Sequence, residues 1–128
     1  MIDRAGFAAW IEAYERAWRA EGTAHLRELF TDDAGYRHSP YEAPITGLAA
    51  IERDWEQERE GPDEVFTMTA EIIAVEGDTG VAKVAVTYGD PVTQEYLDLW
   101  IVRFAADGRC AVYEEWPFWP DQPWTAGT

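Results

Sequence analysis

The hydrophobic period changes once along this chain of 128 residues, and no other feature of the sequence constrains the fold as strongly. Over residues 3–60, apolar side chains recur every three or four positions, which predicts helices. From Glu64 onward the period approaches two, which predicts strands whose alternate side chains face opposite sides of a sheet. Helices followed by hairpin-connected strands are typical of an α+β domain with its helices on one face of a mostly antiparallel sheet.

Three helices are expected before the change in period. The first covers residues 3–20, starts at the cap Asp3, and has an inward stripe made of Phe7, Trp10, Ile11, Tyr14, Ala17 and Trp18. A short second helix, capped by Thr23, leaves His25 exposed and points three side chains inward: Leu26, Leu29 and Phe30. The third covers residues 48–60, and its inward residues are Leu48, Ile51 and Trp55.

Five strands are expected around and after these helices. A short strand over residues 35–39 places Tyr36 and His38 on one face, and four antiparallel strands cover residues 65–76, 81–88, 94–105 and 109–116. The outer face of the sheet is expected to carry apolar side chains that need a cover: Val84, Val86, Tyr88, Leu97, Leu99 and Ile101. A homodimer through this face would provide that cover.

The charge and cysteine content exclude several classes of function. There are 25 acidic and 10 basic side chains, so the formal net charge is −15, which argues against binding to nucleic acid or to anionic membranes. Cys110 is the single cysteine, which excludes an intrachain disulfide and fits a reducing compartment. With short apolar runs and no signal-peptide pattern at the N-terminus, a cytoplasmic protein without a membrane segment is expected.

The motifs resemble those of the nuclear transport factor 2-like superfamily, which includes ketosteroid isomerase and the SnoaL-like polyketide cyclases. Residues 29–34 (LFTDDA) resemble the family's L-F-x-D-D-A, and residues 47–51 (GLAAI) resemble its G-x-x-A-I. Arg103-Phe104 with Asp107-Gly108-Arg109 resembles the hairpin before the family's last strand. The resemblance implies a cystatin-like or nuclear transport factor 2-like roll: a cone-shaped, curved sheet wrapped by three N-terminal helices around a cavity, often paired as a homodimer.

The resemblance to ketosteroid isomerase extends to single positions. Tyr14 falls where that enzyme keeps its oxyanion-hole tyrosine, and His38 falls where it keeps the carboxylate that shuttles the proton. The protonated aspartate of its oxyanion hole matches Trp100 here, with Asp98 two residues away on the same face of the strand. The base and the acidic donor of that enzyme are therefore both replaced, which argues against steroid isomerisation.

The candidate catalytic residues are His38, Tyr14 and Glu115. An imidazole can exchange protons near neutral pH, a buried tyrosine can donate to a developing oxyanion, and strand alternation with the family register turns Glu115 inward beside Tyr113. Each has a structural alternative: His38 can be a core histidine, Tyr14 can fill volume, and Glu115 can be solvated at the rim.

The remaining candidate residues would bind a small apolar or aromatic ligand. They are Tyr36, Trp55, Phe66, Asp98, Trp100 and Tyr113. A cone filled by aromatic side chains, without a cavity, is the alternative. The sequence contains no metal-binding or phosphate-binding motif, so neither a metal site nor a cofactor is expected.

The chain is expected to form one domain over residues 1–118, followed by a tail over 119–128 that carries Trp119 and Trp124. The prolines of this tail exclude regular structure, and its tryptophans are expected to fold back onto the domain or onto a partner chain.

Three functions remain open: a ligand-binding protein, a cofactor-free isomerase, cyclase or hydrolase that uses His38, and a dimeric structural module with a packed interior.

Overall fold

The structure is a computed structural model that describes residues 1–59 and 63–122. The helices are α1 (Arg4–Arg19), α2 (Leu26–Leu29) and α3 (Leu48–Glu58). The strands are β1 (Phe30–Arg37), β2 (Ile45–Thr46), β3 (Phe66–Glu76), β4 (Thr79–Tyr88), β5 (Gln94–Phe104) and β6 (Cys110–Phe118). None of the described helices is long and apolar enough to cross a membrane.

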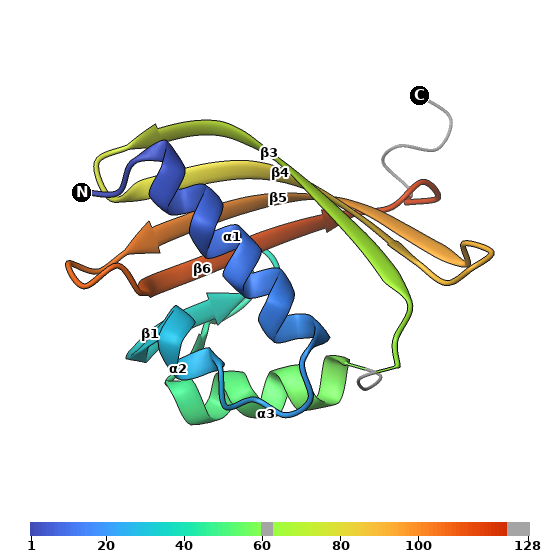
Figure 1. The fold of residues 1–128 in the computed structure, drawn as a ribbon, viewed down its shortest axis with the longest axis horizontal. Coiled ribbons are helices and arrows are strands. Elements are labelled where there is room, and N and C mark those ends of the chain that lie inside the picture. Colours follow the sequence, from blue (N-terminus) through green and yellow to red (C-terminus); the bar gives the residue numbers. More distant parts are fainter. Residues whose placement is uncertain (60–62, 123–128) are drawn as a thin grey trace.

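One twisted sheet contains all six strands, in the order β2-β1-β6-β5-β4-β3. Every neighbouring pair is antiparallel except β1 and β6, which are parallel. Helix α1 crosses one face of this sheet, and α3 lies next to β1 and the edge strand β2 (Figure 1). The predicted α+β class, with three helices and a mostly antiparallel sheet, is confirmed.

Helix α1 is fixed at both ends. At its start the carboxylate of Asp3 accepts a hydrogen bond from the amide of Gly6 at 2.7 Å, as an N-cap does. After its end the guanidinium of Arg59 donates to the carbonyls of Ala17, Ala20 and Gly22. A charged residue just after α3 therefore donates to carbonyls in the last turn of α1 and in the loop that follows it.

Several predicted boundaries differ from the structure. Phe30 was assigned to the second helix but begins β1, because it pairs with Cys110 of β6. Thr23 caps no helix, since its hydroxyl donates to Glu52 and α2 starts only at Leu26. The loop before α3 contains the two-residue strand β2, which local patterns did not indicate. The predicted end of the third helix, residue 60, lies outside the described residues.

The pairing of β4 and β5 corrects the predicted outer face. Val84 pairs with Asp98 and Val86 with Tyr96, and cross-strand partners share a face of a sheet. Val84 is fully buried against the helices, so assigning it and Val86 to the outer face was wrong, and Tyr88 shares their parity. The outward residues of β5 are Leu97, Leu99 and Ile101, as predicted.

The two ends of the space between α1 and the sheet are filled differently. At one end, here called the closed end, small and aromatic side chains pack without polar groups: Phe7, Phe30, Gly80, Ala82, Phe104 and Cys110. A Cβ on Gly80 would lie only 2.5 Å from the ring of Phe7, so the strand needs glycine at this position. The opposite end opens into a pocket.

The start of the tail lies against the sheet. The ring of Trp119 contacts that of Tyr96, with centroids 6.1 Å apart. Gln122 is only 1% exposed, accepts from the Trp119 amide and donates to the Pro117 carbonyl. Trp124 lies outside the described residues.

Candidate functional site

A pocket of about 490 Å³ opens at the end of the sheet opposite the closed end. Helix α1, helix α3 and all the long strands contribute to its wall, together with His38 just after β1. Aromatic rings provide much of the surface: Tyr14, Trp18, Tyr36, Phe66, Tyr88, Tyr96 and Trp100. We call this region the pocket end.

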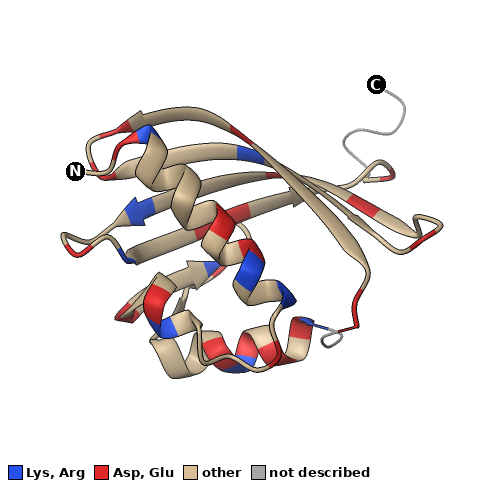
Figure 2. Cartoon of the chain, in the orientation of Figure 1, with Lys and Arg blue, Asp and Glu red and all other residues tan. Residues whose placement is uncertain are grey.

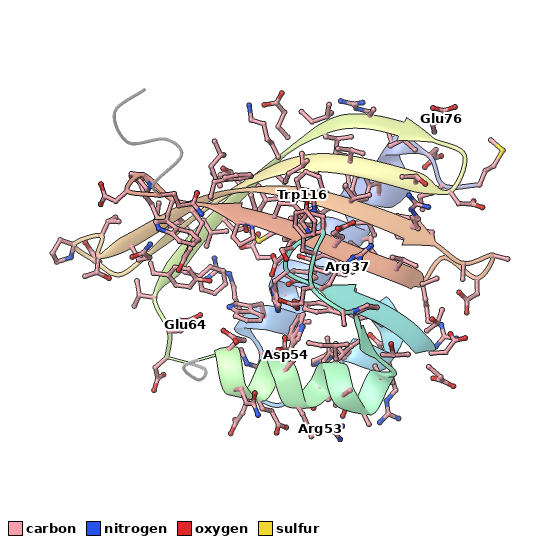
Figure 3. The ribbon with its side chains drawn as sticks, turned by 180° about the vertical axis from the view of Figure 1, so that it is seen from behind. Arg37, Arg53, Asp54, Glu64, Glu76 and Trp116 are labelled. Carbon is pink, nitrogen blue, oxygen red and sulfur yellow. The ribbon has the colours of Figure 1, made fainter. Side chains whose placement is uncertain are left out.

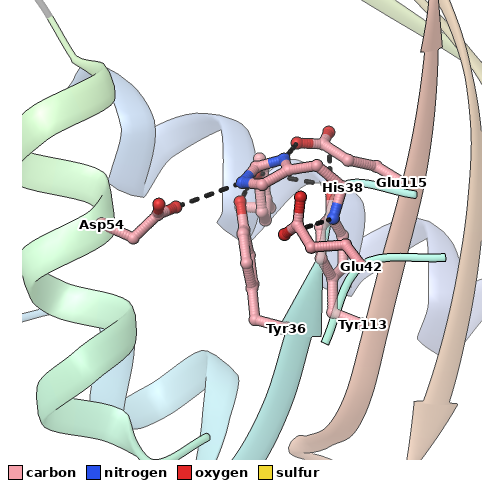
Figure 4. A network of polar contacts seen from close by, with 7 residues as sticks. Tyr36, His38, Glu42, Asp54, Tyr113 and Glu115 are labelled. Atoms are coloured by element: carbon pink, nitrogen blue, oxygen red, sulfur yellow. Dashed lines mark hydrogen bonds and ion pairs between the residues drawn. The ribbon is translucent and has the colours of Figure 1, made fainter. Parts of the chain in front are cut away.

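His38 lies between two carboxylates (Figure 4). Its Nδ1 is 2.8 Å from Glu115 Oε1, and its Nε2 is 3.3 Å from Asp54 Oδ2. The imidazole also meets the ring of Tyr36 edge-on, with centroids 5.2 Å apart. Both nitrogens can donate to these carboxylates only when the ring is protonated.

The neighbouring carboxylates decide the protonation of His38. The hydrogen bond to Glu115 raises the pKa of His38 to about 9, against the opposing effect of burial, and the charges of Glu115 and Asp54 add to the increase. At neutral pH the imidazole is therefore a cation. It can give a proton to a substrate, but it must first lose one before it can act as a base.

Three tyrosine hydroxyls extend this network inward. The Tyr113 hydroxyl lies 3.0 Å from Glu115 Oε2 and 3.4 Å from the Tyr14 hydroxyl, which is 3.3 Å from that of Tyr36. Burial, together with nearby charge such as that of Glu115, raises the pKa of all three phenols well above the usual value. They remain neutral hydrogen-bond donors, which is the state that an oxyanion hole requires.

Asp98 lies apart from this chain of hydrogen bonds. The residue is only 7% exposed, lines the pocket, and its Oδ1 has no hydrogen-bond partner among the described residues. Burial, and secondarily the charge of Glu115, raises the pKa of Asp98 to about 8. At neutral pH the pocket wall therefore carries a predominantly protonated carboxyl group at this position.

The structure brings most of the predicted residues to one pocket. Seven of them line it: Tyr14, Tyr36, His38, Phe66, Asp98, Trp100 and Glu115. Trp55 does not, because its ring packs behind Tyr14 and Trp18, with centroids 5.0 and 4.8 Å away. Tyr113 is fully buried beneath Glu115 and reaches the site only through its hydroxyl.

Asp54 was missed by the sequence analysis. It points from α3 toward the sheet, whereas the neighbouring Arg53 points away (Figure 3). The position follows Ile51 by three residues and so borders the inward stripe of α3, but this spacing alone does not separate it from the other acids of that helix. Within residues 1–59 and 63–122, no group of three or more acidic, histidine or cysteine side chains is arranged to bind a metal ion.

This architecture, a curved antiparallel sheet with a pocket beneath an N-terminal helix, defines a class of small α+β proteins. The SnoaL-like domain family matches residues 11–113, and the chain belongs to that family within the nuclear transport factor 2-like superfamily. A search of curated proteins finds no significant match.

Solved structures with this fold have diverse descriptions. A nuclear transport factor 2-like protein of unknown function from Burkholderia xenovorans has a TM-score of 0.70 at 16% identity, over 94% of this chain and 90% of that chain. A candidate polyketide cyclase from Sinorhizobium meliloti has a TM-score of 0.65 at 23% identity, over 84% and 93%. A computationally designed binder of 17-OHP has a TM-score of 0.67 at 17% identity, over 84% of this chain and 88% of that chain. At these identities the similarity shows the fold alone.

Proposed function

We propose that this protein binds a small apolar or aromatic molecule in the pocket end. The observation that carries the proposal is a pocket of about 490 Å³ lined by seven aromatic rings, in a protein whose closed end is packed. Cavities of this size, with apolar walls and a few convergent polar groups, are the usual form of small-molecule sites. The designed 17-OHP binder shows that a related scaffold can serve this purpose.

Titration with the neutral dye N-phenyl-1-naphthylamine tests this proposal, because its fluorescence rises when it leaves water. Val86 lines the pocket, so Val86→Phe should reduce the dye's affinity by about tenfold or more through steric exclusion. Val81→Phe is the matched control, since it makes the same change on the outer face of the same strand. Equal affinities for both variants and the wild type would contradict binding in this pocket.

A second candidate function is cofactor-independent acid–base catalysis, as in an isomerase, cyclase or hydrolase. The observation that favours it is His38 between Glu115 and Asp54, beside the neutral phenol of Tyr14. In such a reaction Glu115 or Asp54 would take a proton from a carbon atom of the substrate, and Tyr14 would donate a hydrogen bond to the developing oxyanion. His38 would then relay the proton from that carboxylate back to the substrate.

Isomerisation of cyclohex-3-en-1-one to its conjugated isomer tests this chemistry with a simple ketone, followed by ultraviolet absorbance. The wild type should accelerate the reaction, and His38→Gln should lower the rate by about 100-fold. His25→Gln is the control, because His25 is exposed and distant from the pocket lining. Dye binding with no acceleration, or with equal rates in both variants, would leave ligand binding as the function.

For assembly, we propose a homodimer through the outer face of the sheet. The support is a group of apolar side chains turned away from the helices, in which Leu97 is paired with Phe118 and Leu99 with Trp116. Leu97 is 50% exposed, and Figure 3 shows Trp116 on the face of the sheet opposite α1. Analytical ultracentrifugation should give twice the chain mass of 14.5 kDa, and Leu97→Lys should return the protein to a monomer.

A further inference from the structure

Acidic side chains dominate the polar part of the pocket wall. The five acids are Asp54, Glu58, Glu64, Asp98 and Glu115, contributed by α3, the segment before β3, β5 and β6. His38 is the one basic side chain among the described residues of this wall, and two of the acids already hold it. An anionic ligand would therefore meet several like charges at short range.

The arginines near the pocket leave this negative character in place. Arg59 directs its guanidinium to the backbone carbonyls that follow α1. Arg19 pairs with Glu15 at 2.9 Å, lies over the ring of Phe66, and is not part of the described pocket lining. Figure 2 shows that acids also outnumber bases over the surface of α3, so the approach to the pocket is negative as well.

Asp98 supplies the second, independent observation. A buried carboxyl oxygen without a hydrogen-bond partner costs free energy, and Asp98 Oδ1 has no such partner within the part of the chain that the structure describes. Tyr96 and Trp100 flank it on the same face of β5 and also line the pocket. A carboxyl group beside aromatic faces is the arrangement that proteins use to bind ammonium groups, through charge and through cation–π attraction.

We propose that the pocket selects an aromatic amine, whose protonated nitrogen pairs with Asp98 while its ring packs against the aromatic wall. The inference rests on the proposed ligand-binding function and names the class of ligand. The Asp98 carboxyl faces Glu115, the His38 imidazole and the Tyr88 phenol. Asp98 is predominantly protonated at neutral pH. Because an ammonium group pairs with the ionised carboxylate, its binding displaces this proton.

Three probes of nearly equal size test the inference: 2-phenylethylamine, 2-phenylethanol and 3-phenylpropanoate. Trp18 and Trp100 line the pocket, so intrinsic tryptophan fluorescence reports their binding. The amine should bind about tenfold or more tightly than the alcohol, and the carboxylate more weakly than both. Calorimetry in two buffers of different ionisation enthalpy should show proton release with the amine and none with the alcohol.

Asp98→Asn separates the charge from the shape of the site. This variant should lose the preference for the amine and the proton release, while 2-phenylethanol binds as before, which also shows that the pocket is intact. Glu95→Gln is the matched control, because it removes one acid from the exposed side of the same strand and should change nothing. Equal affinity of amine and alcohol in the wild type would overturn the amine inference and leave ligand binding standing. No fluorescence change with any of the three probes, and no dye binding, would overturn both.

Discussion

The closed end and the pocket end are built on the same strands and differ in the type of residue that those strands turn inward. Along β5 the inward residues change from Phe104 and Val102 at the closed end to Asp98 at the pocket end. Along β6 they change from Cys110 to Glu115. The alternation stays constant along β5, whereas a register shift between Cys110 and Val112 moves it by one residue in β6. One hydrogen-bonded scaffold therefore carries both a packed core and a polar site.

The comparison shows that the two ends meet different physical requirements. Apolar side chains at the closed end need only complementary shapes, and Gly80 provides the space for Phe7. Polar groups at the pocket end need partners: His38 has two carboxylates, and Tyr14 has two phenols, whereas Asp98 keeps an unsatisfied oxygen. Substitutions at the closed end should therefore change stability alone, and those at the pocket end should change pH dependence and binding.

The largest effect is expected at the closed end, from Phe7→Ala. Phe7 is fully buried and contacts Phe104 edge-on, so removing its ring leaves a cavity and should lower the free energy of unfolding by about 3–5 kcal/mol. Urea denaturation measures this. The exposed Ile73→Ala should cost little, and N-phenyl-1-naphthylamine should bind the folded Phe7→Ala variant as it binds the wild type. A loss of dye affinity equal to that of Val86→Phe would show that the two ends are not separate.

The second effect is a pH dependence that originates at His38. Its pKa is raised in the folded state from about 6.5 to about 9, so its stabilising contribution is complete below pH 6.5 and is lost as the pH rises through 9. The contribution amounts to about 3 kcal/mol. Urea denaturation of the wild type and His38→Gln at pH 6 and pH 9.5 should show a smaller loss in the variant. Parallel pH profiles would mean that Glu115 and Asp54 do not hold the proton on His38.

A third effect has the opposite sign. Asp98 holds a proton in the folded state up to a pKa of about 8, whereas the unfolded chain loses it near 3.8, so the stability of the wild type falls between these values as the pH rises. Asp98→Asn does not titrate, and its free energy of unfolding should exceed that of the wild type by about 1–3 kcal/mol at pH 8. The difference should vanish near pH 4. Glu95→Gln should match the wild type at both pH values, and an Asp98→Asn variant less stable than the wild type at pH 8 would contradict this account.

The smallest effect is expected beyond β6. Gln122→Ala removes hydrogen bonds to the Trp119 amide and the Pro117 carbonyl and should cost about 1 kcal/mol. The exposed Asp121→Ala is the control. A measurable loss in thermal stability for Gln122→Ala alone would mean that the start of the tail belongs to the folded unit. Identical melting temperatures for both variants would support the predicted domain end at residue 118.

Local patterns predicted the long elements well, most clearly where α1, β4 and β5 each bury a periodic face. They failed where long-range pairing decides the structure. Phe30 continues a helical stripe in sequence, yet its pairing with Cys110 places it in β1. The outer face was only half correct for a related reason, since the parity of Val84 follows from its partner Asp98 rather than from its own neighbours.

The candidate site shows the same division. His38, Tyr14 and Glu115 could be chosen from residue type, alternation and family resemblance, but Asp54 could not be ranked above other acids of α3 without the packing of that helix against His38. Trp55 has the type and the face of a pocket residue, and yet Tyr14 and Trp18 lie in front of it. Proximity between elements far apart in the chain is not encoded in any local period.

By itself, the sequence determined the order of the long elements, the inward residues of α1, and the acidic, aromatic character of the interior, because these follow from local periodicity and composition. The tertiary structure alone decided which end of the interior is packed and which is open, that His38 is a cation, and that Asp98 has an unsatisfied oxygen. The reason is physical: burial and pKa depend on atoms that folding brings near a group, and those atoms come from distant parts of the chain.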